Sequence, residues 1–187
     1  DSTQSHGVKW AAAGGGGGGG TTIIAELTAQ RADLPDTGFA ARGKFGTSWI
    51  VTTLDYDTTS QESAYWTMPI PSGWNFTNAS AVIYLYWFGT TGYASATSST
   101  VVWSIQTRSV ANDEVLDATT TPAQATVTIT DFITANSDLA VSSAVIVNST
   151  AWATDDLVQI NITRVPGNAA DNFTGDAKFV NAIIRLV

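Results

Sequence analysis

The stretch Leu157–Arg164, LVQINITR, decides the fold. Apolar and polar residues alternate along it, with Val158, Ile160 and Ile162 on one side and Gln159, Asn161 and Thr163 on the other. Successive side chains of a β-strand point to opposite faces of a sheet, so this period of two predicts a strand with one buried and one solvated face. Strands of this kind are typical of antiparallel sheets.

Outward from this stretch, residues 47–187 contain further segments rich in Val, Ile, Thr, Tyr and Trp, which favour strands. The expected strands are Thr47–Leu54, Glu62–Met68, Ser80–Phe88, Thr100–Arg108, Ala125–Thr130, Ser143–Val147, Leu157–Arg164 and Ala177–Val187. A helical period is absent, although a short helix fits residues 112–117 or 131–135. Many short strands predict an all-β domain, an antiparallel two-sheet sandwich of the jelly-roll type.

Ser80–Phe88 differs from the other expected strands because it is apolar on both faces. Tyr84 and Tyr86 fall on one face, whereas Ile83 and Leu85 fall on the other. Either a loop covers the aromatic face, or this face meets a neighbouring subunit.

Residues 1–46 are interpreted as an extended N-terminal arm that precedes the sandwich at 47–187. The arm contains seven consecutive glycines, Gly14–Gly20, and one expected strand, Thr21–Leu27. Glycines lose much backbone entropy on ordering, but residues without side chains can pass through a tight channel or pack around an axis. We therefore interpret the segment as an assembly arm, with Gly14, Gly16, Gly18, Gly20, Ile23, Ile24 and Leu27 as its candidate contact residues.

Charge and composition exclude several classes of partner. Charged residues make up 13% of the chain, and the net charge is −8 with only eight basic residues, which are scattered. Nucleic acids and anionic membranes bind clustered Lys and Arg, so neither is an expected partner. No stretch has the roughly 18 apolar residues that span a bilayer. Cysteine is absent, which excludes disulfides and thiolate metal sites.

The sequence offers little for catalysis. His6 is the only histidine and lies in the arm, so a Ser–His–Asp triad has no histidine within the domain. The glycine run lacks the Lys-Ser/Thr of a phosphate loop. We expect no enzymatic activity, no catalytic residue and no cofactor. Asp171 and Asp176 flank a turn and are the best candidates for a structural calcium, but they lack the spacing of a calcium loop.

Aromatic residues and sequons are the candidate recognition features. Trp74 and Trp152 lie in expected loops and suit stacking on a ligand, although a loop Trp more often caps a core or packs in an interface. Tyr84 and Tyr86 are further candidates for such contacts. Five Asn-x-Ser/Thr triplets, at Asn75, Asn78, Asn148, Asn161 and Asn172, are acceptors if the host N-glycosylates its surface proteins.

From residue 54 to the end, short motifs follow one another in a recognisable order. They are Leu54–Thr59, Tyr65–Pro69, Tyr86-Trp87, Val101–Gln106, Asp113–Asp117, Val127–Asp131, Ser137–Leu139, Arg164, Asp171–Thr174 and Asp176–Phe179. In this order the chain resembles a β-sandwich module of structural proteins of tailed bacteriophages, of the decoration or fibre type. The resemblance implies a jelly-roll-like fold and a structural role, and it implies no enzymatic residues. Similar modules often carry Arg and Asp in the last acidic turn, where this chain has Asn172.

Three functions follow from these observations. The first is a virion structural protein, a capsid decoration, spike or fibre component that assembles with itself through its arm and with other virion proteins. The second is a subunit of an extracellular filament, in which Thr21–Leu27 is a donor strand for the next subunit. The third is a carbohydrate-binding module that uses Trp74 or Trp152 to recognise surface glycans. All three place the protein on a virion or at an extracellular surface.

Overall fold

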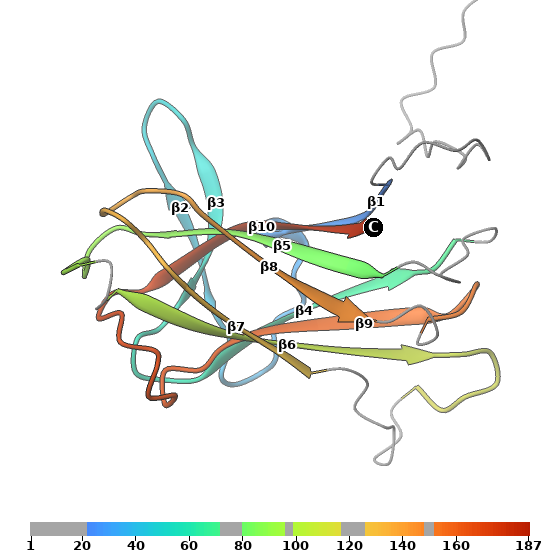
Figure 1. Ribbon diagram of the computed structural model, residues 1–187. Helices are drawn as coiled ribbons and strands as arrows, with labels where there is room; N and C mark the ends of the chain where they lie inside the picture. The colour runs from blue at the N-terminus through green and yellow to red at the C-terminus, as the bar shows by residue number, and fades with distance from the viewer. Residues whose placement is uncertain (1–21, 72–79, 96–98, 117–125, 148–151) are drawn as a thin grey trace, which may run out of the picture.

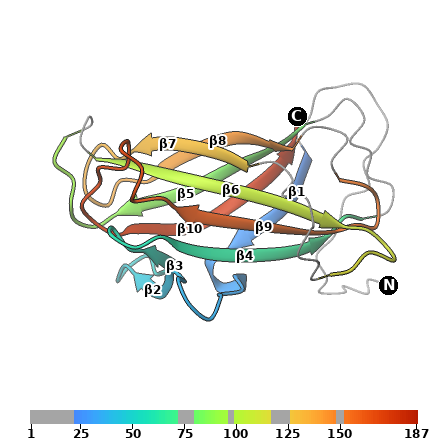
Figure 2. The same cartoon turned by 90° about the horizontal axis from the view of Figure 1, so that it is seen from below.

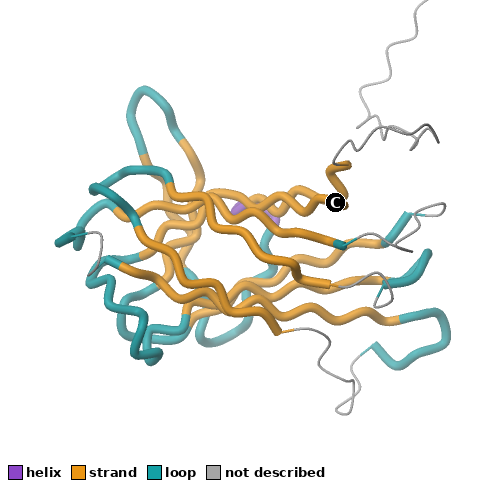
Figure 3. The backbone as a smooth tube through the Cα atoms, in the orientation of Figure 1, coloured by secondary structure: helices purple, strands orange, loops and turns teal. Residues whose placement is uncertain are grey.

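A computed structural model describes residues 22–71, 80–95, 99–116, 126–147 and 152–187. Strands make up most of this described chain, and a single turn of 3-10 helix, η1 (Ala29–Arg31), interrupts them (Figure 3). The ten strands are β1 (Thr22–Thr28), β2 (Ala41–Phe45), β3 (Val51–Tyr56), β4 (Glu62–Pro69), β5 (Ala81–Gly89), β6 (Thr100–Val110), β7 (Thr126–Phe132), β8 (Ala140–Val147), β9 (Leu157–Arg164) and β10 (Ala177–Leu186).

The strands form two antiparallel sheets that pack face to face (Figure 1). The first sheet has the order β2-β3-β10-β5-β8, and the second has the order β4-β9-β6-β7. The first and last strands of the sandwich, β3 and β10, pair with each other, and the chain crosses repeatedly between the sheets, as in a jelly roll. The predicted fold class is confirmed. The short helices expected at 112–117 and 131–135 are wrong: within the described residues these segments are turns and the end of β7.

All eight jelly-roll strands, β3 to β10, fall within residues 47–187, but the segment interpreted as an extended arm contributes two more. β1 pairs with β10, and β2 pairs with β3. Ile24 and Leu27 are buried in the core, so apolar burial holds β1 against the sandwich. The strand predicted for exchange between subunits thus completes the sheet of its own chain. Residues 1–21, with the glycine run, lie outside the described residues.

Large aromatic side chains fill the space between the sheets. The Trp103 ring meets Tyr56 edge-on at 5.1 Å between centroids and Trp87 at 5.7 Å. Trp87 also donates from Nε1 to Ser142 Oγ at 2.8 Å. The Tyr56 hydroxyl donates to the Ile162 carbonyl oxygen at 3.1 Å, and burial raises the pKa of Tyr56 well above its usual value.

A buried arginine ties the last long loop to the core. Arg164, which is fully buried at the end of β9, forms an ion pair with Asp171 at 2.9 Å. Its guanidinium also donates to the carbonyl oxygens of Tyr56, Phe173 and Gly175. Arg164, Asp171 and Phe173 of the resemblance motif therefore act together with Gly175 as one structural tie.

Candidate functional site

The outer face of the first sheet carries aromatic, amide and hydroxyl side chains beside one another. Register places them in rows that cross four strands, because residues opposite one another in an antiparallel pair share a face. From β8 through β5 and β10 to β1, the rows are Val141-Tyr86-Asn181-Thr28, Ser143-Tyr84-Ile183-Glu26 and Val145-Val82-Arg185-Ile23. Each row spans about 14 Å. The prediction that β5 is apolar on both sides is confirmed.

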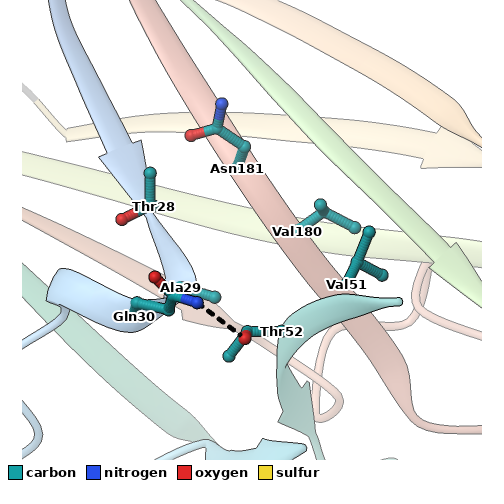
Figure 4. A pocket seen from close by; sticks show the side chains of 7 residues that line it. All are labelled: Thr28, Ala29, Gln30, Val51, Thr52, Val180 and Asn181. Carbon is teal, nitrogen blue, oxygen red and sulfur yellow. Dashed lines mark hydrogen bonds between the residues drawn. The ribbon is translucent and has the colours of Figure 1, made fainter. Parts of the chain in front are cut away.

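A pocket of about 250 Å³ lies at the end of the first row. It exists because β1 and β3 pair with the same edge of β10, β3 with residues 177–179 and β1 with residues 181–186. Val180 lies between the two paired stretches, at the register shift that β10 makes against β5. The pocket is lined by Thr28, Ala29, Gln30, Val51, Thr52, Val180 and Asn181 (Figure 4).

Hydrogen bonds hold the polar side chains of this pocket in place. Gln30 donates from Nε2 to Thr52 Oγ1 at 3.0 Å, which joins η1 to β3 (Figure 4). Asn181 donates from Nδ2 to Glu26 Oε1 at 2.8 Å, which fixes the orientation of its amide. Within the part of the chain that the structure describes, Asn181 Oδ1 is buried and accepts no hydrogen bond.

Arg42 fixes the turn at the rim of the pocket. Its guanidinium donates to the carbonyl oxygens of Ala29 at 2.7 Å, Gln30 at 3.0 Å and Ala32 at 2.5 Å. These bonds cap the end of η1, so the backbone at the rim of the pocket is held in its conformation without a ligand.

The charges on this outer face are already compensated. Lys178 lies 2.5 Å from Asp55, and the Arg185 guanidinium lies over the Tyr84 ring at 4.9 Å from its centroid. The face thus offers aromatic rings, amides and hydroxyls, and it has no free cluster of cations among its described residues.

The β2–β3 hairpin stands beside this face (Figure 1). It leans over the sheet, because Phe45 at the end of β2 packs on Phe88 of β5 with 4.7 Å between ring centroids. At its tip, the Trp49 side chain is 82% exposed. The hairpin therefore covers Phe88 but leaves Tyr84 and Tyr86 partly open to solvent.

The outer face of the second sheet has ordinary polar chemistry. Ser63, Thr163 and Ser104 form one row across it, and Tyr65, Asn161 and Gln106 form the next. Ser63 and Thr163 share a hydrogen bond of 2.7 Å, and Thr163 bonds Asn161 Oδ1 at 3.1 Å. This face is polar and partly exposed, although Thr163 itself is buried, and it supplies a matched control for the first face.

The two calcium candidates at the loop end of the sandwich have different surroundings. Asp171, one of the two calcium candidates, is committed to Arg164 and accepts from the Val102 amide at 3.0 Å, while Asp176 is exposed. No group of three potential ligands occurs among the described residues.

Two other acidic residues have shifted pKa values. Burial raises the pKa of Glu62, whereas hydrogen bonds from the Thr59 side chain and the Thr59 and Ser60 amides lower the pKa of Asp57.

The structure separates the predicted aromatic candidates. Trp152 is only 3% exposed, so it packs against the core, which is the more frequent role of a loop Trp, and it cannot stack on a ligand. Tyr84 and Tyr86 lie together on the outer face, as predicted. Trp74 lies outside the described residues.

The predicted sequons and glycines are only partly described. Asn161 is half-buried on the polar face, and Asn172 is exposed and accepts from the Thr100 amide at 2.8 Å. Their use as glycosylation sites stays a prediction. Asn75, Asn78, Asn148 and the four candidate glycines lie outside the described residues. The described part holds no helix long and apolar enough to cross a membrane.

Sequence reasoning missed Thr28, Gln30, Thr52 and Asn181. Three of them are hydroxyl or amide residues in segments more than 120 residues away from Asn181, so only the pairing of β1 and β3 with β10 brings them together. The exposed position of Trp49 was also missed. The strand expected at Thr47–Leu54 included this residue, whereas β3 begins only at Val51. Gly46 and Ser48 before it were the available sign of a turn.

Comparisons with known proteins add little to this description. No protein family matches the chain, and no curated protein matches it either. Solved structures are similar only at a low level, and two of them serve as examples. TmCBM61 in complex with β-1,4-galactotriose has a TM-score of 0.37 and 8% identity, over 88% of this chain and 85% of that one. Caldicellulosiruptor saccharolyticus CBM27-1 in complex with mannohexaose has a TM-score of 0.40 and 11% identity, over 88% and 96%. Similarities of this size assign no ligand to this chain.

Proposed function

We propose that this protein is a non-catalytic module that binds a neutral carbohydrate chain on the outer face of its first sheet. The observation that carries the proposal is the row Tyr86-Asn181-Thr28, which leads from an aromatic ring to an amide and a hydroxyl at the pocket. An aromatic body beside a few placed polar groups is the usual composition of a small-ligand site.

The ligand is neutral because the face provides no excess positive charge. Lys178 and Arg185 are engaged with Asp55 and Tyr84, and the whole chain carries a net charge of −8. Sulfated or uronic-acid polymers need clustered cations, whereas uncharged sugars need aromatic faces and paired hydrogen bonds.

Retention in native gels that contain galactan or mannan tests this proposal. Tyr86→Ala and Asn181→Ala are expected to weaken retention at least about tenfold, equivalent to ~1.4 kcal/mol each. Tyr65→Ala, a matched tyrosine on the opposite outer face, should leave retention unchanged. Heparin in the gel should give no retention of the unmodified protein.

Two outcomes contradict the proposal. One is the lack of retention by any neutral polysaccharide in a broad panel. The other is an equal loss for Tyr65→Ala and Tyr86→Ala, which assigns the effect to the fold and not to this face.

A second candidate function is a virion structural role in capsid decoration, a spike or a fibre, with assembly through the N-terminal arm. The observation that favours it is the buried tie of Arg164 to Asp171 and to the carbonyl oxygens of Phe173 and Gly175, which lies in the segment that resembles phage structural modules. The double variant Gly16→Val/Gly18→Val should then melt at the same temperature as the unmodified protein but fail to assemble. Normal assembly by this variant removes the arm from the proposal. This role and glycan binding are compatible in one protein.

A further inference from the structure

Most sheet edges in the described part of this molecule are protected against pairing with another chain. Residues 33–39 run along β4, where the Asp33 amide donates to the Tyr65 carbonyl oxygen at 2.8 Å and the Tyr65 amide donates back at 2.9 Å. β7 and β8 lie side by side, joined by the Ser142 hydroxyl and Asp131 at 2.6 Å (Figure 2). β2 is short and carries Arg42 and Lys44. Covering, short length and charge are the devices by which proteins block edge pairing.

β1 lacks each of these devices. It pairs with β10 on one side, and no described residue forms a backbone hydrogen bond with its other side. It is seven residues long, contains no proline, and has Glu26 as its single charge. The Ile23 side chain on this strand is 52% exposed. An unpaired strand edge whose residues have high β propensity and almost no charge is a template on which another strand can pair.

We infer that the free edge of β1 pairs antiparallel with β1 of a second copy of this chain, so that the first sheet continues across a two-fold axis. An antiparallel pair of identical strands is self-complementary, and this satisfies both edges at once and closes the assembly as a dimer. Glu26 is the single charge on β1, so the pairing brings only one carboxylate from each copy to the shared edge, although each copy carries −8 overall.

The position of the glycine run fits this occupant. Thr22 pairs with Leu186, so residues 1–21 join the sheet at one end of the free edge. In sequence, the glycine run Gly14–Gly20 ends two positions before Thr22 and carries no side chains. In a two-fold pair, the two junctions lie at opposite ends of the shared edge.

Amide hydrogen exchange of the full-length protein tests the inference, with sedimentation analysis alongside. Successive amides of an edge strand point alternately inward and outward, so an unpaired β1 protects only alternate amides among residues 22–28. We expect protection of both sets at high protein concentration and loss of the outward set on dilution, together with a dimer in sedimentation. The edge strand β2 is the internal control, and its outward amides should exchange rapidly at every concentration.

Substitutions give a second, independent test. Ile23→Lys places a charge on the shared edge and should raise the dissociation constant of the dimer at least tenfold, whereas Leu139→Lys, at a similarly exposed leucine in the β7–β8 loop, should not change it. A monomer at all concentrations overturns the inference. So does protection that is independent of concentration, which would mean that residues 1–21 of the same chain cover the edge. An oligomer whose dissociation constant does not change with Ile23→Lys also overturns the inference, and this result would indicate that the N-terminal arm makes the contact instead.

Discussion

At the scale of single residues, the buried ion pair of Arg164 and Asp171 is the most consequential interaction. Both side chains are excluded from solvent, and Arg164 also satisfies three carbonyl oxygens. Arg164→Met should therefore lower the free energy of unfolding by about 3–5 kcal/mol, because it leaves a buried carboxylate and three acceptors without their donor. Urea denaturation measures this loss. Lys178→Met, which breaks the partly exposed pair with Asp55, should cost less than about 1 kcal/mol. Equal costs would contradict the structural role assigned to Arg164.

Glu62 gives a prediction about pH dependence. Its pKa in the folded protein is raised, first by burial and then by Asp57 and Asp176, so folding favours the protonated form. This contribution to stability is present below the unfolded pKa of about 4.3 and is lost as pH rises through the folded value. Glu62→Gln keeps an acceptor for the Asp57 amide and should be more stable than the unmodified protein at pH 7. The difference should vanish below about pH 4 in thermal melts. Asp57→Asn should show the opposite sign at pH 7, since the pKa of Asp57 is lowered. A pH-independent difference for Glu62→Gln would contradict this account.

At the scale of elements, the β2–β3 hairpin depends on Gly46. This residue has φ of +95°, and a Cβ atom placed on it would lie 1.9 Å from the Trp49 carbonyl oxygen. Gly46→Ala should therefore destabilise the protein by about 1–3 kcal/mol and shift the fluorescence of the exposed Trp49. Gly167→Ala is the matched control, because its Cβ would meet nothing within 4 Å and its φ is not positive. It should be neutral or stabilise by up to about 1 kcal/mol. Similar losses in the two variants would show that the turn geometry is not limiting.

The elements also show what the sequence can predict. Alternating patterns located nine of the ten strands among the described residues, and Leu157–Arg164 was placed to the residue, because a period of two is a local property of the chain. β2 was missed because Ala41–Phe45 holds two basic residues and a glycine, and its partner β3 supplies the stability that its own composition lacks. The pocket was not predictable, because it arises where β1 and β3 end beside β10 and depends on a register shift near Val180. Such a junction has no signature in the sequence of any one strand.

At the scale of the whole molecule, the proposed glycan site and the proposed dimer contact at β1 together predict that a dimer binds a long glycan more tightly than a monomer does. If β1 pairs with β1 of a second copy, the first sheet continues across the dimer, and the outer faces of both copies lie on the same side. The two glycan sites of one dimer can then bind the same polymer chain, and once the first site is occupied, binding at the second site is intramolecular. Ile23 lies two rows away from the row of Tyr86 and Asn181, so Ile23→Lys should weaken binding to a long neutral polysaccharide by about 100-fold while leaving the affinity for a short oligosaccharide unchanged.

Tyr86→Ala should behave differently, because Tyr86 lies in the row beside the pocket and not on the β1 edge. It should weaken binding to short and long chains alike and leave the dimer intact. Titration calorimetry with an oligosaccharide and a polymer of the same sugar separates the two variants. If Ile23→Lys lowers the affinity for the oligosaccharide as strongly as for the polymer, the edge and the site are one surface, and the dimer contributes no avidity.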